Sequence, residues 1–354
     1  MNVRVAPRDA GLDSLKGLLV ILMVFCHVLQ FFVDLQAFPR AAVWIDFINV
    51  LVFPCFLFIF GRTAQLAFLS KPFQKAWPRI VCQAVKLYGA FCFSGIGYRV
   101  LAENRPLRQR TVNRILTLQD IPGWSEFLIA FAILSLLILI GFKFWQWLIT
   151  HRLAFGIVCV LPIIASAVIP YEQISNVHFA LFIGGTQYAY FSALLYLPYM
   201  MLGLIAQSHS IRKHFGAWVL GALPLFLPAF IITLTRGLPS RFPPSPFWLM
   251  LPALGIVLVS LATDGWARLR SWLANRLSLP SALRAILILP DRAVRYIGRH
   301  SLYCLLVSNL ILFTLHGKNI APELMLKAGI PCDYLSPLFL GLPLGQSFCF
   351  VAWG

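Results

Sequence analysis

Long apolar runs alternate with short polar connectors along almost the whole chain. A helix needs about 20 apolar residues to cross the hydrocarbon core of a membrane. Runs of that order lie near residues 13–33, 43–69, 80–100, 123–142, 153–170, 187–207, 216–235, 245–264, 300–316 and 334–353. They are continuous blocks of Leu, Phe, Ile and Val, unlike the short alternating segments of a transmembrane β-barrel. The pattern predicts an all-α, polytopic transmembrane bundle of about ten spans.

Composition agrees with this pattern and removes other classes of protein. Of the 354 residues, 60% are hydrophobic and 12% are charged, and the mean hydropathy is +0.81. A soluble domain is charged at roughly a quarter of its positions. No tract outside the runs exceeds about 35 residues, which is short for a soluble domain, so we expect a single integral membrane domain over residues 1–354.

Neither a metal nor a nucleic acid is expected as a partner. The histidines show no metal-ligand spacing, and the cysteines form no CxxC pair. The formal net charge is +17, but the basic residues are scattered over the connectors without interleaved aromatic residues. That charge instead favours contact with membrane lipid.

Basic residues in the connectors also predict the orientation of the bundle. With the N-terminus in the cytoplasm, eighteen Lys and Arg residues fall on the cytoplasmic face and ten on the opposite face, as the positive-inside rule requires. The connector near residues 99–120 departs from the rule, because it carries five Arg residues and is expected outside. It forms either an interfacial helix on anionic head groups or a dock for an anionic acceptor, in which case Arg105 and Arg110 are the candidate contacts.

Ionisable residues inside an apolar run are costly and point to function. In the first run, Lys16 precedes His27 by eleven positions, so the two lie within about 20° of one azimuth and about 16 Å apart along a helix. Asp13 falls near the same stripe. Imidazole is suited to exchange a proton near neutral pH, so the stripe predicts an anionic ligand on Lys16 with its reactive end near His27. The alternative is a His bonded to a neighbouring helix and a Lys that extends to the interface.

Two further runs carry candidate binding residues. Pro54 and Gly61 in the second run either free backbone groups for a ligand or serve helix packing. At the start of the fourth run, Glu126 is a candidate to bind a sugar hydroxyl, and Trp124 is a candidate to stack on a sugar face. The alternative is an interfacial Trp beside a solvated Glu.

Three segments resemble the membrane acyltransferase 3 family. LDSLKGLLVILMVFCHV in the first run is similar to that family's opening, in which a basic residue precedes an intramembrane His by eleven positions. FPCFLFIFG at Phe53 to Gly61 and IGRHSLYCLLVS at Ile297 to Ser308 resemble two further family motifs, in the same order along the chain. The chain departs from the family at Ser308, where a His is common, and at Lys75 and Arg79, where an Arg pair is common.

The resemblance implies an enzyme that transfers an acyl group, acetyl by default, from cytosolic acyl-coenzyme A to a hydroxyl of an envelope or secreted carbohydrate. It implies a multi-pass protein of the bacterial cytoplasmic membrane, with His27 as general base or acyl carrier and with Lys16 and Asp13 on the donor side. The basic residues expected to contact acyl-coenzyme A are Lys16, Arg62, Lys75, Arg79 and Arg299. No metal is expected.

A transporter or flippase for a polysaccharide or lipid-linked saccharide is the alternative function. Some proteins that resemble this family have been assigned to polysaccharide export, and a helical bundle with one polar path is compatible with that role. The aligned Lys16 and His27 favour the enzyme, because a transporter does not need a basic residue at that spacing.

Overall fold

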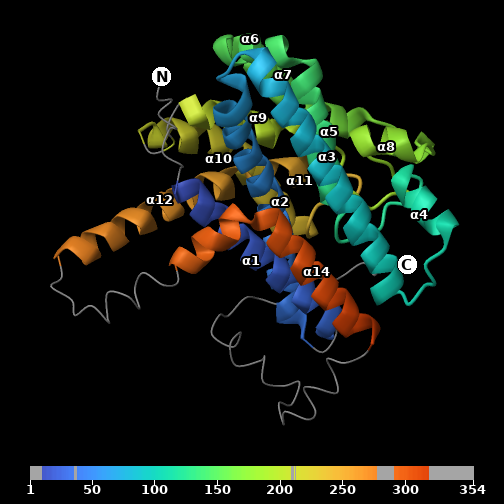
Figure 1. Cartoon of the computed structure of the whole chain (residues 1–354). Coiled ribbons are helices and arrows are strands. Elements are labelled where there is room, and N and C mark those ends of the chain that lie inside the picture. The colour runs from blue at the N-terminus through green and yellow to red at the C-terminus, as the bar shows by residue number, and fades with distance from the viewer. Residues whose placement is uncertain (1–9, 36–37, 209–210, 212, 277–290, 319–354) are drawn as a thin grey trace.

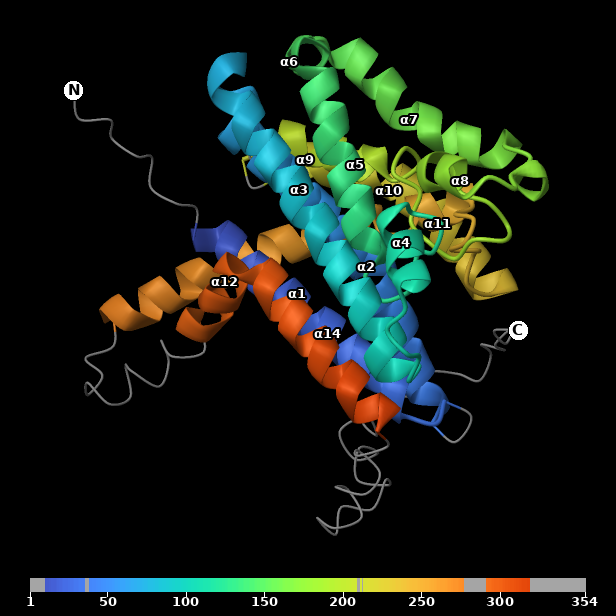
Figure 2. The ribbon, with the colours of Figure 1, turned by 45° about the vertical axis from the view of Figure 1, so that its right-hand side comes forward.

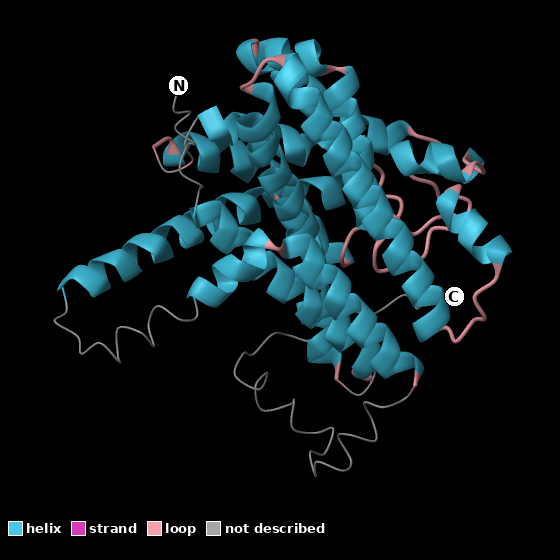
Figure 3. Ribbon diagram, in the orientation of Figure 1, coloured by secondary structure: helices cyan, strands magenta, loops and turns pink. Residues whose placement is uncertain are grey.

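The computed structural model describes residues 10–35, 38–208, 211, 213–276 and 291–318. Every regular element in this part of the chain is a helix (Figure 3), and the only strand-like pairing in it is an isolated bridge between Gly185 and Tyr188. The predicted all-α class is confirmed.

The helices follow one another along the chain with short connections (Figure 1). In order, they are α1 (Ala10–Phe32), α2 (Pro39–Ala64), the π-helix η1 (Gln65–Leu69), α3 (Phe73–Gly97), the π-helix η2 (Tyr98–Ala102), α4 (Gln109–Leu116), α5 (Glu126–Ile140), α6 (Phe142–Thr150), α7 (Arg152–Val168), the 3-10 turn η3 (Tyr171–Gln173), α8 (Val177–Ile183), α9 (Leu197–Ser208), α10 (Phe215–Arg236), α11 (Pro246–Met250), α12 (Ala253–Arg276), the helix Asp291–Arg299 and α14 (Ser301–Gly317).

Five of the described helices are long and apolar enough to cross a membrane, and the number rises to seven if each of two bent helix pairs is one span. Two shorter apolar helices fall in the fifth and sixth predicted runs: Arg152–Val168 matches the fifth, and Leu197–Gln207 covers only the second half of the sixth. The tenth run, near residues 334–353, lies outside the described residues. The described chain is therefore an integral-membrane type of bundle with five to seven candidate spans, and it does not reach the ten expected.

The sixth run differs most from the prediction. It was expected to be helical from about residue 187, but the helix begins only at Leu197. Gly184 adopts a φ of +85°, which ends α8 and turns the chain away from helical geometry. The segment that follows is non-helical, and Tyr190, Phe191 and Tyr196 are buried in it. Such irregular backbone is stable at membrane depth only where the protein itself covers it.

The helices α1 and α14 run side by side in the same direction, while α2 runs antiparallel to α1 (Figures 1 and 2). A glycine contact closes one end of the first pair: a Cβ on Gly298 would lie 1.8 Å from the carbonyl oxygen of Asp13. At the other end, His27 meets Asn309. We refer to these as the Asp13 end and the His27 end of the bundle.

A second close helix pair forms the centre of the bundle. Here α2 and α9 approach at Gly61 and Gly203, where an added Cβ would lie 1.9 Å from the backbone oxygens of Met200 and Phe58. Small residues let transmembrane helices pack backbone to backbone in this way. Gly61 therefore serves packing, and α2 continues as an α-helix through Pro54.

Two sharp bends interrupt the bundle. The helices α5 and α6 meet at 84° around Gly141, and the helix Asp291–Arg299 meets α14 at 92°. The first bend is fixed by the indole of Trp145, which donates to the carbonyl oxygen of Leu137 at 2.9 Å. The indole thus adds a second donor to a carbonyl that already accepts from the backbone N–H of Gly141, and it ties α6 to the end of α5.

Candidate functional site

His27 is buried in α1 against α14, with 9% of its surface exposed. Its Nδ1 lies 3.1 Å from Oδ1 of Asn309, which is 2% exposed. The amide nitrogen of Asn309 donates to the carbonyl oxygen of Trp124 at 3.2 Å. Because that bond uses the NH2 group, Oδ1 faces His27, and the imidazole must donate from Nδ1. Nε2 therefore keeps its lone pair, which is the form that a general base needs.

Trp124 is held in a strained backbone conformation beside His27. Its φ is +72°, a left-handed value that costs a residue with a bulky side chain about 1–3 kcal/mol. Its ring stacks on Phe31 of α1 with centroids 4.2 Å apart and lies edge-on to His27 at 5.1 Å. Contacts to α1 and the hydrogen bond from α14 thus hold the indole against the imidazole.

Arg241 approaches the same region from the connector between α10 and α11. Its guanidinium acts electrostatically on His27 and on two carboxylates, Asp46 of α2 and Glu126 of α5. Glu126 is 9% exposed, and its Oε2 is buried without a hydrogen-bond partner; Nε of Arg241 is likewise buried without one. Such atoms are rare in folded proteins and call for an explanation.

Aromatic rings fix the position of Arg241. Its guanidinium lies over Phe191 at 4.8 Å from the ring centroid and over Phe242 at 4.6 Å. Phe191 in turn stacks on Phe53 of α2, with ring centroids 3.7 Å apart. These cation–π contacts hold the guanidinium beside the two rings.

Polar side chains of α2 lie in the same region as His27. Asn49 lies one turn from Asp46, and its Oδ1 is 3.7 Å from Sγ of Cys26 in α1. The side chains gathered at the His27 end therefore come from α1, α2, α5, α14 and two connectors. We refer to them as the His27 cluster, which comprises His27, Asp46, Trp124, Glu126, Arg241 and Asn309.

At the Asp13 end, the predicted donor-side residues lie on neighbouring helices. Asp13 is 3% exposed, and its Oδ2 lies 3.3 Å from Nε of Arg299, whose side chain is half exposed. Lys16 is half-buried and lies three positions further along α1. Nε of Arg62 donates to Oε1 of Gln207 at 3.4 Å, near the ends of α2 and α9.

Lys75 and Arg79 are exposed in the first turns of α3, which runs in the same direction as α1 (Figure 1). All five predicted coenzyme A contacts therefore lie toward one end of the bundle, and His27 lies toward the other. Exposed and half-buried cations of this kind are suited to bind phosphate groups.

Two of the five Arg residues in the basic connector near residues 99–120 pair with its two acids. Arg99 binds Asp120 through two nitrogens, at 2.6 and 3.2 Å, and also pairs with Glu103. Nε of Arg105 lies 2.6 Å from the second carboxylate oxygen of Glu103. The predicted acceptor contact Arg105 is thus engaged within its own connector and is not a member of the His27 cluster.

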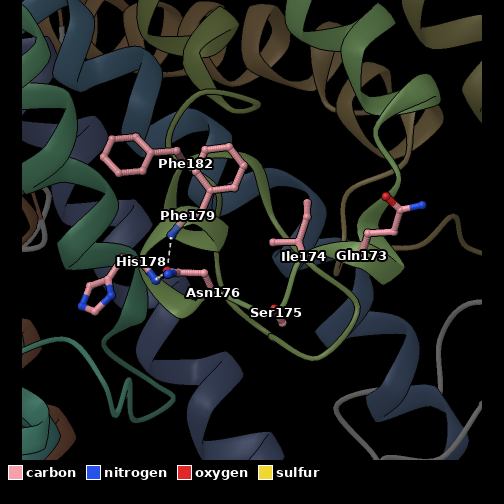
Figure 4. A pocket seen from close by; sticks show the side chains of 7 residues that line it. All are labelled: Gln173, Ile174, Ser175, Asn176, His178, Phe179 and Phe182. Carbon is pink, nitrogen blue, oxygen red and sulfur yellow. Dashed lines mark hydrogen bonds between the residues drawn. The ribbon is translucent and has the colours of Figure 1, made fainter.

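Arg110 belongs to α4, where it lines an open hollow of about 730 Å³ together with Asn113, Arg114, Thr117 and Gln119. A second hollow, of about 510 Å³, lies at the start of α8 (Figure 4). Phe179 and Phe182 lie on one side of it and Gln173 on the other, and Asn176 accepts hydrogen bonds from the first turn of α8. No member of the His27 cluster lines either hollow.

Three members of the His27 cluster were not predicted from the sequence. Asp46 lies within the second apolar run and was detectable as an ionisable residue there. Asn309 is a polar residue in the ninth run, which is a weaker signal. Arg241 gave no signal, because it lies in a connector where a basic residue is ordinary and only the fold brings it to His27.

Among the residues that the structure describes, no group of three or more His, Cys, Asp or Glu side chains is placed to hold a metal ion. Comparisons of the chain with protein-family models, with curated proteins and with solved structures found no match.

Proposed function

We propose that the protein is a membrane-bound O-acyltransferase that moves an acyl group, acetyl by default, from acyl-coenzyme A to a hydroxyl of an envelope or secreted carbohydrate. The observation that carries the proposal is the hydrogen-bond chain from Trp124 through Asn309 to His27, which leaves Nε2 as an acceptor. A buried imidazole with one nitrogen held as donor and the other unprotonated is the arrangement of a general base.

The chemistry follows from that arrangement. Nε2 of His27 takes the proton of the acceptor hydroxyl, and the oxygen of that hydroxyl attacks the carbonyl carbon of the thioester. The carbon–sulfur bond breaks, and the coenzyme A thiolate takes the proton back from His27. The ester formed on the sugar and the free thiol balance the reaction without an oxidant or a metal.

The two ends of the bundle divide the substrates. Lys16 and Arg299 at the Asp13 end are suited to the phosphates of coenzyme A, and Asp13 holds the guanidinium of Arg299 in place. Trp124 and Glu126 at the His27 end are suited to the sugar. With the N-terminus in the cytoplasm, the donor side faces the cytosolic pool and the acceptor side faces outward, in the bacterial cytoplasmic membrane.

Mass spectrometry of envelope and secreted glycans tests the proposal, with cells that express the wild type or His27→Ala at equal levels in the membrane. An acyl-sized mass increment that requires His27 supports the transferase and identifies the acyl group. Acylation that persists in the His27→Ala cells refutes the proposed mechanism.

Transport of a polysaccharide or lipid-linked saccharide is the second candidate, and the two sharply bent helix pairs favour it, because interrupted helices are typical of transporter binding sites. In the same experiment, transport predicts glycans with unchanged modification but a changed amount outside the cell. It also predicts movement of saccharide into vesicles that lack acyl-coenzyme A.

A further inference from the structure

The unpartnered atoms of the His27 cluster form a donor and acceptor pair. Nε of Arg241 is a donor and Oε2 of Glu126 is an acceptor, and both are buried without a partner. The two groups act on each other electrostatically. Leaving such atoms unsatisfied is unfavourable, so a ligand that supplies both missing bonds is favoured.

A hydroxyl group matches this pair, because it donates one hydrogen bond and accepts others. Two hydroxyls of one sugar ring would donate to Oε2 of Glu126 and accept from Nε of Arg241. The half-buried rings of Trp124 and Phe31 supply an aromatic surface beside these groups. An aromatic face next to paired donors and acceptors is suited to the apolar face and polar rim of a sugar.

The charges of the cluster disfavour an acidic sugar. Two carboxylates, Asp46 and Glu126, act on the single guanidinium of Arg241. His27 adds no positive charge when Nε2 is unprotonated. A carboxylate on the ligand would therefore compete with Asp46 and Glu126 for one cation, and each of these side chains would repel it while ionised.

We infer that the His27 cluster binds a neutral sugar, and that Arg241 and Glu126 hold its hydroxyls while Asp46 excludes acidic sugars. This inference rests on the proposed function only for the identity of the reaction. The binding of the sugar does not depend on it. It differs from the expectation of an anionic acceptor on the Arg105 and Arg110 connector.

Binding can be measured without acyl-coenzyme A, so its outcome is independent of catalysis. The full-length protein in lipid nanodiscs is titrated with methyl β-D-glucoside and with methyl β-D-glucuronide, which differ by a CH2OH and a carboxylate, and saturation-transfer NMR reports the affinities. We expect the wild type to bind the glucoside more tightly than the glucuronide. Arg241→Gln should lower the affinity for the glucoside by about tenfold, the value of one lost hydrogen bond to a charged group. Arg236→Gln, an exposed position at the end of α10, is the matched control and should change neither affinity.

Asp46→Asn provides the sharper test, because the side chain keeps its shape and loses its charge. We expect the affinity ratio of glucuronide to glucoside to rise by at least about tenfold, the effect of removing a like charge about 12 Å away at an effective dielectric of about 20. The inference is overturned if the wild type binds the glucuronide at least as well as the glucoside, if the ratio is unchanged in Asp46→Asn, or if neither sugar gives a signal that Arg241→Gln reduces.

The glycan spectra separate this inference from the proposed function. Acyl groups on neutral residues, lost in His27→Ala, support both. Acyl groups on uronic acid residues leave the transferase standing and overturn the neutral-sugar site. Glucoside binding that depends on Arg241, without acylation in any glycan, supports the site and refutes the transferase.

Discussion

Replacement of Asn309 by Leu should impair catalysis while leaving binding of the donor intact. Asn309 is 2% exposed and joins two hydrogen bonds, to Nδ1 of His27 at 3.1 Å and to the carbonyl oxygen of Trp124 at 3.2 Å. Leu has a similar size, so the change removes both bonds without leaving a large cavity. Without the amide oxygen, nothing from α14 selects the His27 tautomer that leaves Nε2 as a base.

The expected size of the effect follows from those bonds. A net hydrogen bond is worth about 0.5–1.5 kcal/mol, and a buried group left without its partner costs about 1–3 kcal/mol. Because about 1.4 kcal/mol corresponds to a tenfold change in rate, kcat should fall by about tenfold to a hundredfold. The KM for acyl-coenzyme A should change by less than about threefold, because Asn309 lies at the His27 end and the donor contacts lie at the Asp13 end.

The assay is release of the coenzyme A thiol by protein in nanodiscs, with the acceptor identified from the glycan spectra. Ser308→Ala is the matched control, because the Ser308 hydroxyl donates only to the carbonyl oxygen of Leu305 within α14; its kcat should stay within about twofold of the wild type, as for loss of one local bond. A monodisperse gel-filtration profile for both variants excludes misfolding. Unchanged kcat in Asn309→Leu, or a loss confined to KM, would refute the assigned tautomer.

Three further predictions concern packing, the basic connector and the donor side. Gly203→Ala places a methyl group against the α2 backbone and should lower the melting temperature by a few degrees, since overpacking costs about 1–3 kcal/mol; Gly221→Ala, in open space, should not. Arg99→Gln leaves the largely buried Asp120 carboxylate without its cation and should lower stability by about 1.5–3 kcal/mol in denaturant titrations, and an unchanged midpoint would count against this. Asp13→Asn frees its partner guanidinium and should raise the KM for acyl-coenzyme A by about tenfold with kcat nearly unchanged; a fall in kcat alone would place Asp13 outside donor binding.

The sequence predicts the helices better than it predicts the number of spans. Continuous apolar runs determine where helices form, and α1, α2, α3, α10 and α14 lie where the pattern places them. The pattern does not distinguish a span from apolar chain that is buried in another way. Residues 187–196 belong to a predicted run, yet they form an irregular segment whose Tyr190, Phe191 and Tyr196 are buried by neighbouring parts of the protein.

The site shows the same division between local and distant information. The stripe of Asp13, Lys16 and His27 depends on one helix, so its periodicity is readable from the sequence. The partners of Asp13 and His27, which are Arg299 and Asn309, are 286 and 282 positions away in the chain. No pattern within the first run specifies which residue of α14 will face His27.

Pairing across that distance decides what each polar group in α1 can do. A lone His in an apolar helix is as compatible with a packing role as with catalysis, and a hydrogen bond to Asn309 alone would not separate the two. The second bond of Asn309, to Trp124, supports the catalytic role that we propose, because it fixes which amide atom faces the imidazole and hence which ring nitrogen keeps a lone pair. Trp124 lies beside the imidazole of His27 with a φ of +72°. It keeps this strained conformation although the residue before it in the chain is a glycine. A packing contact does not need a left-handed Trp that orients an amide, which in turn orients an imidazole. The same arrangement suits the base that we propose, held next to an aromatic binding surface.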